Sequence, residues 1–166
     1  MTEPATELHP DVKNFLDRSG IIYRVFNCNP ELADTAVFCE HYGFLPRQAA
    51  NTIITASKTD PVQFACCIVL GNCKLDVNKK VCQLLGVKKA SFASSEQTVQ
   101  LTGMMIGGVT PFGLPDIPIF IDSAVLGESE VVLGGGNRSS KVLLAPAELT
   151  KLPSSQVVEG LAAPKE

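Results

Sequence analysis

The stretch that decides the fold is "NTIITASKTDPVQFACCIVL", residues 51–70. Its two apolar segments, 51–57 and 62–70, are rich in β-branched residues, which is typical of strands. Between them, Lys-Thr-Asp-Pro at 58–61 has the composition of a turn. The stretch therefore predicts a β-hairpin. Because few polar residues interrupt it, we expect the hairpin to be buried on both faces.

Helices and further strands are predicted on either side of this hairpin. Cap residues, prolines and terminal glycines place helices at 9–20, 34–43, 75–86, 94–103 and 146–152, with a short helical turn at Pro46. Alternating or β-branched segments predict strands at 21–28, 88–92, 117–122, 130–134 and 141–145. Since the elements alternate without a strict βαβ rhythm, the expected fold is one α+β domain over residues 1–166 around a mixed, strongly curved sheet. Residues 160–166 are expected to fray.

Charge and hydropathy argue against several classes of protein. The net charge is −3, with an isoelectric point of about 5.4, whereas proteins that coat DNA or RNA by counterion release are basic. A nucleic-acid contact should therefore be local, and we expect no DNA partner. No apolar run reaches the roughly 18 residues of a membrane span. The acidic N-terminal segment lacks the apolar core of a signal peptide, so we expect a cytoplasmic protein.

No metal or cofactor motif is evident. The six cysteines form no Cys-x-x-Cys pair, and the two histidines have no ligand spacing, so the thiols are expected to be reduced and buried. The Gly-rich segments match neither a Walker loop nor a dinucleotide fingerprint. Residues 1–166 also contain no evident Ser-His-Asp or Cys-His set.

Residues 103–115, "GMMIGGVTPFGLP", form an unusually apolar loop with four glycines and two prolines. One interpretation is a rigid rim whose N–H groups, at Gly107, Gly108, Val109 and Thr110, point into a cleft and hold a carbonyl, a water or an oxyanion. The other is a tight turn between a helix and a strand, which the loop alone favours.

Two further places carry candidate polar contacts. In "LGGGNRSSK", residues 133–141, Arg138 could pair with a phosphate or a carboxylate, or it could be an exposed arginine in a glycine-rich hairpin. Asn51 and Thr52 are polar at the start of an aliphatic strand. Because buried polar groups need partners, Asn51 either caps the strand or lines a pocket.

Taken in order, several of these segments resemble the YbaK family, also called the prolyl-tRNA synthetase-associated domain family. The matching pieces are "EHYGFLPRQAANTI", "KLDVNKKVCQLLGVKKASFA", "LTGMMIGGVTPFG", "PIFID" and "LGGGNRSSK", within a core of about residues 20–152. The resemblance implies a barrel-like mixed sheet surrounded by helices. It also implies metal-independent hydrolysis, in trans, of the ester of a mischarged aminoacyl-tRNA. The Gly-x-x-x-Pro loop, Gly107 to Pro111, would then position the ester or the water through backbone groups. The tRNA itself would supply a vicinal hydroxyl.

The sequence departs from the family pattern at one important place. Deacylase members open the central strand with a lysine in a "KTL"-like motif, and Asn51 stands at that place here. Lys141 lies where some members have an acidic residue, so we hypothesise that the positive charge has been relocated. Catalytic roles are therefore expected for Gly107, Gly108, Asn51 and Lys141.

The resulting expectation is a small apolar pocket that binds the 3′ end of a mischarged tRNA, with an aminoacyl-tRNA synthetase as a further partner. Its expected binding residues are Tyr23, Thr52, Met105, Ile106, Val109, Thr110, Pro111 and Arg138. Tyr23 fits ordinary core packing equally well. Because Asn51 carries no charge, the alternative is a catalytically silent module that binds an aminoacyl or nucleotide-like ligand. The sequence leaves the oligomeric state undetermined.

Overall fold

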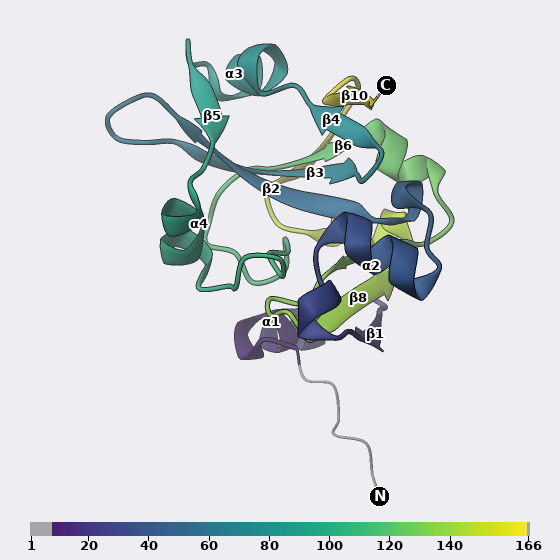
Figure 1. Ribbon diagram of the computed structural model, residues 1–166. Helices are drawn as coiled ribbons and strands as arrows, with labels where there is room; N and C mark the ends of the chain where they lie inside the picture. The colour runs from purple at the N-terminus through teal and green to yellow at the C-terminus, as the bar shows by residue number, and fades with distance from the viewer. Residues whose placement is uncertain (1–7, 166) are drawn as a thin grey trace, which may run out of the picture.

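The computed structural model describes residues 8–165, which form curved sheets with short helices packed around them (Figure 1). Residues 1–7, where the expectation of no signal peptide falls, and residue 166 lie outside the described range. The strands are β1 (Arg24–Asn27), β2 (Ala50–Ser57), β3 (Phe64–Leu70), β4 (Cys73–Leu75), β5 (Ala90–Phe92), β6 (Ile119–Asp122), β7 (Val131–Gly134), β8 (Ser140–Leu144), β9 (Ser155–Val158) and β10 (Ala162–Pro164). The α-helices are α1 (Pro10–Ser19), α2 (Thr35–Tyr42), α3 (Cys82–Leu85) and α4 (Ser95–Thr102).

The hairpin predicted from residues 51–70 is the centre of the molecule. β2 and β3 pair antiparallel, with Asn51 opposite Val69 and Thr55 opposite Ala65. They belong to a five-stranded sheet of order β5-β2-β3-β6-β9, in which β6 is parallel to both β3 and β9. The sheet is therefore mixed, as predicted.

A second sheet, of order β1-β8-β7, meets the first along β2. A single parallel bridge between Ala49 and Val132 joins them. A third pair, β10-β4, lies at the other end of the molecule, beside α3 (Figure 1). Over residues 8–165 the strand pairings do not close into a complete barrel, but the α+β class and the mixed sheet are confirmed.

Local signals in the sequence explain the helices. His9 caps α1 through its side chain, and Gly20 ends that helix in the left-handed conformation. Ser94 and Gln97 form the capping box of α4. The single helix expected at 75–86 is instead a π-helix, Val77–Val81, followed by α3, and the helix expected at 146–152 is the 3₁₀ helix η5, Pro146–Lys151.

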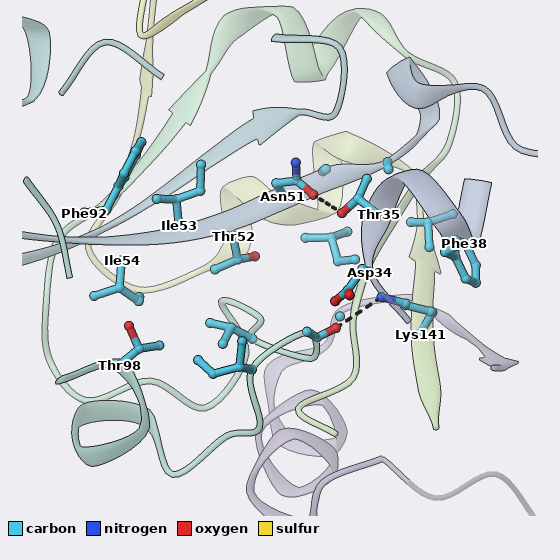
Figure 2. A pocket seen from close by; sticks show the side chains of 18 of the residues that line it. Asp34, Thr35, Phe38, Asn51, Thr52, Ile53, Ile54, Phe92, Thr98 and Lys141 are labelled. Carbon is cyan, nitrogen blue, oxygen red and sulfur yellow. Dashed lines mark hydrogen bonds between the residues drawn. The ribbon is translucent and has the colours of Figure 1, made fainter. Parts of the chain in front are cut away.

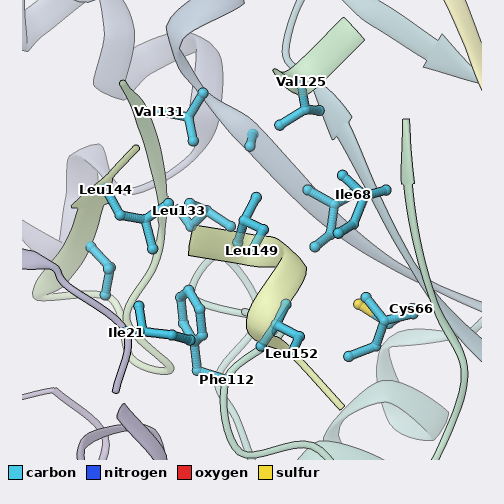
Figure 3. Close-up of a cluster of buried hydrophobic side chains, with 14 of the residues drawn as sticks. Ile21, Cys66, Ile68, Phe112, Val125, Val131, Leu133, Leu144, Leu149 and Leu152 are labelled. Atoms are coloured by element: carbon cyan, nitrogen blue, oxygen red, sulfur yellow. The ribbon is translucent and has the colours of Figure 1, made fainter. Parts of the chain in front are cut away.

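The hairpin separates two apolar clusters, so it is buried on both faces as predicted. Cys66 and Cys67 are both fully buried although they face opposite ways. The cluster between the two sheets is the larger (Figure 3). Its members come from several elements and include Ile21, Cys66, Ile68, Phe112, Val131, Leu133, Leu144, Leu149 and Leu152. The other cluster packs the opposite face of β3 against the π-helix and the C-terminal segment.

The expectation that residues 160–166 fray is wrong for the described part. β10 pairs with β4, and Leu161 just before it is fully buried. Pairing and burial together fix this segment, although its own sequence has little strand propensity. β9, which the sequence also did not predict, is held in the same way by parallel pairing with β6.

Candidate functional site

The candidate site lies along the outer edge of β2. β7 reaches this edge only at the Ala49–Val132 bridge, and β5 pairs only with residues 55–57. The Ala49 carbonyl accepts a hydrogen bond from Gly71, next to β3, whereas the Ile54 carbonyl accepts one from Ala93 on the outer side. Because carbonyls alternate along a strand, the backbone N–H and C=O of Thr52 point outward into the gap between β5 and β7.

A cavity of about 330 Å³ occupies this gap. Side chains from α2, β2, β5, α4 and β8 converge on it (Figure 2). Aliphatic and aromatic groups form much of its wall, and a few hydroxyl, amide and charged groups are spaced around it. The side chains that Figure 2 labels are Asp34, Thr35, Phe38, Asn51, Thr52, Ile53, Ile54, Phe92, Thr98 and Lys141.

The two glycine-rich loops pack backbone against backbone beneath the cavity. The Met105 N–H donates to the Gly136 carbonyl at 3.1 Å, and the Gly136 N–H donates to the Gly108 carbonyl at 2.7 Å. A Cβ on Gly108 would overlap the backbone of Asn137, and one on Gly134 would lie 2.5 Å from the Gly108 carbonyl oxygen. The glycines are therefore required by this close approach, which neither loop reveals alone.

The loop does not direct all of its N–H groups toward the cavity. The Gly108 N–H donates to the Met105 carbonyl at 2.9 Å and so closes a turn. Gly107 and Val109 line the cavity, together with Ile106. The segment is thus a tight turn, as one interpretation predicted, and it also forms part of the wall of the cavity.

Lys141 is a buried cation in the cavity wall. Only 7% of the residue is exposed, and its Nζ donates to the Ala33 carbonyl at 2.7 Å and to the Gly107 carbonyl at 3.4 Å. The Nζ also lies 5.1 Å from the ring centroid of Phe38, a favourable cation–π position. Loss of water is the largest cause that lowers the pKa of Lys141 below its ordinary value of 10.5. An ammonium has three N–H donors, and within residues 8–165 the structure gives it two carbonyl acceptors.

The side chains of Asn51 and Thr52 leave the strand on opposite faces (Figure 2). The Asn51 Oδ1 accepts a hydrogen bond from the Thr35 hydroxyl at 2.6 Å, which fixes the amide at the edge of the cavity. The Thr52 hydroxyl is buried and has no hydrogen-bond partner within residues 8–165. A buried hydroxyl without a protein partner is a candidate contact for a ligand.

Arg138 connects three segments around the cavity instead of facing solvent. Its guanidinium donates to the Pro30 carbonyl at 3.0 Å, to the Ile106 carbonyl at 3.0 Å and to Asp34 Oδ1 at 3.1 Å. The carboxylate it pairs with belongs to the chain itself, and Arg138 does not line the cavity. Arg138 fixes the entry to α2 against the loop.

Five other residues expected at the site lie outside the cavity wall. The Tyr23 hydroxyl donates to Asp17, and Met105 is 53% exposed. Pro111 lines a different, smaller cavity, and Gly108 and Thr110 are buried within the loop and do not line the main cavity.

Sequence reasoning missed several residues that do line the cavity. The sequence predicts Asp34 and Thr35 only at the start of a helix, and Thr98 and Phe92 only within a helix and a strand, yet all four line the cavity. The sequence carries no signal that these separate segments meet at the edge of β2.

Residues 8–165 offer neither a metal centre nor a membrane-spanning helix. No three His, Cys, Asp or Glu side chains there gather closely enough to hold a metal ion. No helix in that range has the length and apolar character needed to cross a membrane.

Comparison with known proteins identifies the family. A family model described as the aminoacyl-tRNA editing domain matches residues 29–152. The chain belongs to the aminoacyl-tRNA editing domain family. This match covers every element that contributes to the cavity, and it confirms the resemblance found in the sequence.

Similarity to individual proteins agrees with this assignment. The chain is 27% identical, over 122 residues, to EbsC of Enterococcus faecalis, named "Putative Cys-tRNA(Pro)/Cys-tRNA(Cys) deacylase", and the match covers 72% of each chain. It is 36% identical over 91 residues to YwhH of Bacillus subtilis, an uncharacterized protein, but spans only 57% of the length of YwhH and 54% of this chain. A crystal structure described as a "putative trans-editing enzyme for prolyl tRNA synthetase" has a TM-score of 0.79 and 25% identity, covering 92% of this chain and 98% of that one.

Proposed function

We propose that this editing-domain protein is a trans-acting deacylase that hydrolyses the ester of a mischarged aminoacyl-tRNA without a metal ion. The observation that carries the proposal is the cavity at the open edge of β2, where a buried ammonium lies beside the Gly107 loop. The names of EbsC and of the structurally similar trans-editing protein support the reaction class. A cavity of about 330 Å³ is at the small end of the range for small-molecule sites, which suits an aminoacyl group with the terminal adenosine at its mouth.

In this mechanism a water attacks the ester carbonyl carbon, and the bond from that carbon to the ribose oxygen breaks. The proton lost by the water is delivered to the ribose oxygen, with the vicinal hydroxyl of the same ribose as the relay. Negative charge develops on the carbonyl oxygen. The remaining N–H of Lys141 donates to this oxygen, and the low-polarity surroundings strengthen that interaction.

Gly107 and Asn51 are proposed to position the substrate. The Gly107 carbonyl holds Lys141 Nζ on one side of the cavity, and a side chain at this position would overlap Arg138. The Asn51 amide, fixed by Thr35, supplies a neutral donor where deacylases of the family carry a lysine. Compared with those deacylases, the positive charge in this protein lies on β8 and not on β2.

Discrimination between amino acids would follow from size and from one polar contact. Ile54, Ile106 and Val109 leave room for a small side chain. The Thr52 hydroxyl offers a hydrogen bond to the α-amino group or to a polar side chain, and a site with such a buried group rejects analogues that leave it unpaired.

The experiment is a panel of mischarged tRNAs, with Ala-tRNA and Ser-tRNA species first, incubated with the wild-type protein, Lys141→Ala and Asn51→Lys. We expect the wild type to release the amino acid and Lys141→Ala to lose at least about 10²-fold in rate. Thermal unfolding of each variant serves as the control for folding. Unchanged deacylation by Lys141→Ala would refute the proposal that Lys141 replaces the lysine that family deacylases carry on the central strand.

A second candidate function follows from the neutral amide of Asn51. The domain could bind an aminoacyl or nucleotide-like ligand without cleaving it. In that case the wild type would bind mischarged tRNA but release no amino acid, and Asn51→Lys would gain activity. The tRNA panel separates the two functions directly. A synthetase, with prolyl-tRNA synthetase as the first choice, is proposed as a partner that delivers the tRNA.

A further inference from the structure

We infer that a second groove, next to the cavity, binds the RNA strand that leads to the aminoacylated 3′ end. The groove has a volume of about 920 Å³ and lies between β5 on one side and the β4–β10 pair on the other. Lys74, Phe92 and Lys165 are among the residues that line it. This inference deepens the proposed function by assigning the contact that holds the RNA.

Continuity with the cavity is the first argument. Phe92 lines both spaces, so a chain lying in the groove reaches the cavity by passing this ring. The residue is 56% exposed, which is unusual for a phenylalanine. An exposed aromatic ring beside a cationic groove is the arrangement on which a base of single-stranded RNA stacks.

The distribution of charge is the second argument. Residues 72–92 contain five lysines and one acidic residue, Asp76, whereas the rest of the chain has nine basic and sixteen acidic residues. An acidic protein therefore carries one basic region, which we call the lysine patch. Two lysines from other segments lie beside it, because the Lys58 N–H donates to the Lys89 carbonyl and the Lys165 N–H donates to the Asn72 carbonyl. The patch consists of Lys58, Lys74, Lys79, Lys80, Lys88, Lys89 and Lys165.

The third argument is that no ion pair within residues 8–165 involves this patch, although Lys165 Nζ donates to the Gly71 carbonyl at 3.3 Å. The five ion pairs found within residues 8–165 use Lys13, Arg24, Arg47, Arg138 and Lys151, and none of them uses a lysine of the patch. Surface charges of a monomer are commonly interspersed with opposite charges. A region of unneutralised lysines instead fits a partner that brings its own negative charge, and a phosphate backbone provides it at regular intervals.

The position of the patch agrees with this assignment. β4, β5, β10 and α3 lie together at one end of the molecule, and α1 and β1 lie at the other (Figure 1). The basic residues of α1, such as Lys13, therefore lie at the opposite end of the molecule from the groove. The local nucleic-acid contact expected from the net charge is thus placed at one end.

The test measures binding of a short single-stranded RNA ending in CCA, labelled at its 5′ end, by fluorescence anisotropy at several salt concentrations. The test variant is Lys74→Ala/Lys89→Ala/Lys165→Ala. The control, Lys13→Ala/Arg18→Ala/Arg24→Ala, removes the same charge from α1 and β1. A third variant, Phe92→Ala, removes the ring.

We expect the test variant to lower the slope of log K against log salt by about 2, since each lost phosphate contact contributes about 0.7 for a single strand. The control should bind within about twofold of the wild type at physiological salt. Phe92→Ala should weaken binding by about tenfold or more, as loss of one stacked base does. Equal weakening by test and control variants, or none by either, would overturn the inference.

A second readout separates this inference from the proposed function. Hydrolysis of an aminoacyl-adenosine ester, which lacks the RNA strand, should be unaffected by the triple test variant, while kcat/KM for aminoacyl-tRNA falls at least tenfold. If no substrate is cleaved but RNA binding still depends on the patch, the proposed function fails and the groove assignment stands. If both substrates are cleaved equally well by wild type and test variant, the groove assignment fails alone.

Discussion

Lys141 is the residue at which stability and the proposed activity oppose each other most directly. Its ammonium is buried against two carbonyls and an aromatic ring, with no carboxylate among its hydrogen-bond partners within residues 8–165. Burying a charge without an opposite charge beside it costs free energy, and an apolar side chain of similar length avoids that cost. We expect Lys141→Met to unfold at the same or a higher temperature than the wild type, and to lose deacylation.

The difference in stability between Lys141→Met and the wild type should depend on pH in a definite direction. Because the pKa of Lys141 is lowered in the folded protein, the folded state binds the proton less well than the unfolded chain. The free-energy cost of the buried ammonium is fully present below the pKa of the folded state. It disappears as pH rises toward 10.5, the ordinary pKa of lysine. Urea unfolding at a series of pH values should therefore show the stability advantage of Lys141→Met shrinking as pH rises. An advantage that grows with pH would contradict the lowered pKa.

Thr52 offers a test of substrate contact with little effect on folding. Its hydroxyl is buried without a partner within residues 8–165, so Thr52→Val removes no protein hydrogen bond and keeps the shape of the side chain. We expect unchanged or slightly raised stability. If the hydroxyl contacts the substrate, KM for the mischarged tRNA should rise about tenfold, equivalent to about 1.4 kcal/mol. Unchanged KM would contradict a contact between this hydroxyl and the substrate.

At the scale of elements, the two glycine-rich loops act as one unit. Gly108→Ala places a methyl group against the backbone of Asn137, which cannot move aside as a flexible side chain would. We expect a loss of about 1–3 kcal/mol in unfolding free energy, the usual cost of overpacking. The control is Gly127→Ala, where an added Cβ meets nothing within 4 Å and should change stability by less than about 0.5 kcal/mol. Equal unfolding midpoints for both variants would contradict the close packing of the loops.

The C-terminal strand is the second element that can be tested alone. Leu161 is fully buried in the cluster behind β3, and β10 follows it. Leu161→Ala should therefore cost about 2–5 kcal/mol, the range for a buried leucine, whereas a frayed tail would tolerate it. Ala163→Ser, at an exposed place on β10, is the matched control and should leave the denaturation midpoint nearly unchanged.

The elements predicted correctly are those whose signals are local. The 51–70 hairpin, the capping box at Ser94 and the glycine stop at Gly20 each depend on a few adjacent residues. β9 and β10 were missed because distant pairing partners hold them.

The candidate site was predicted only in part, because segments that are distant in the sequence also form it. Lys141 and the 107–109 loop could be named from the family resemblance, but only the fold shows that α2 and α4 complete the wall and that Tyr23 lies elsewhere.

For the whole molecule, the six cysteines report on global unfolding. All are buried, and burial raises the pKa of Cys67 to about 12 and that of Cys66 well above its ordinary value. A thiolate is the reactive species, so we expect these two to react with a thiol reagent at pH 8 only when the molecule unfolds. Labelling followed by mass spectrometry across a urea series should therefore track the loss of circular dichroism. Fast modification of both residues in native buffer would contradict the two-sided burial of β3.

The open edge of β2 has a consequence beyond ligand binding. A strand edge with free N–H and C=O groups is a template onto which another chain can add a strand and begin to aggregate, and proteins guard such edges with charges and covering loops. Here Gly107 and Lys141 line the same cavity as residues 51–54 of β2, so a loop and a positive charge lie near this edge. The residues proposed to form the catalytic pocket would thus also protect the edge of β2 from pairing with a strand of another molecule. A loop loosened by mutation would expose a nucleus for self-association at the centre of the fold.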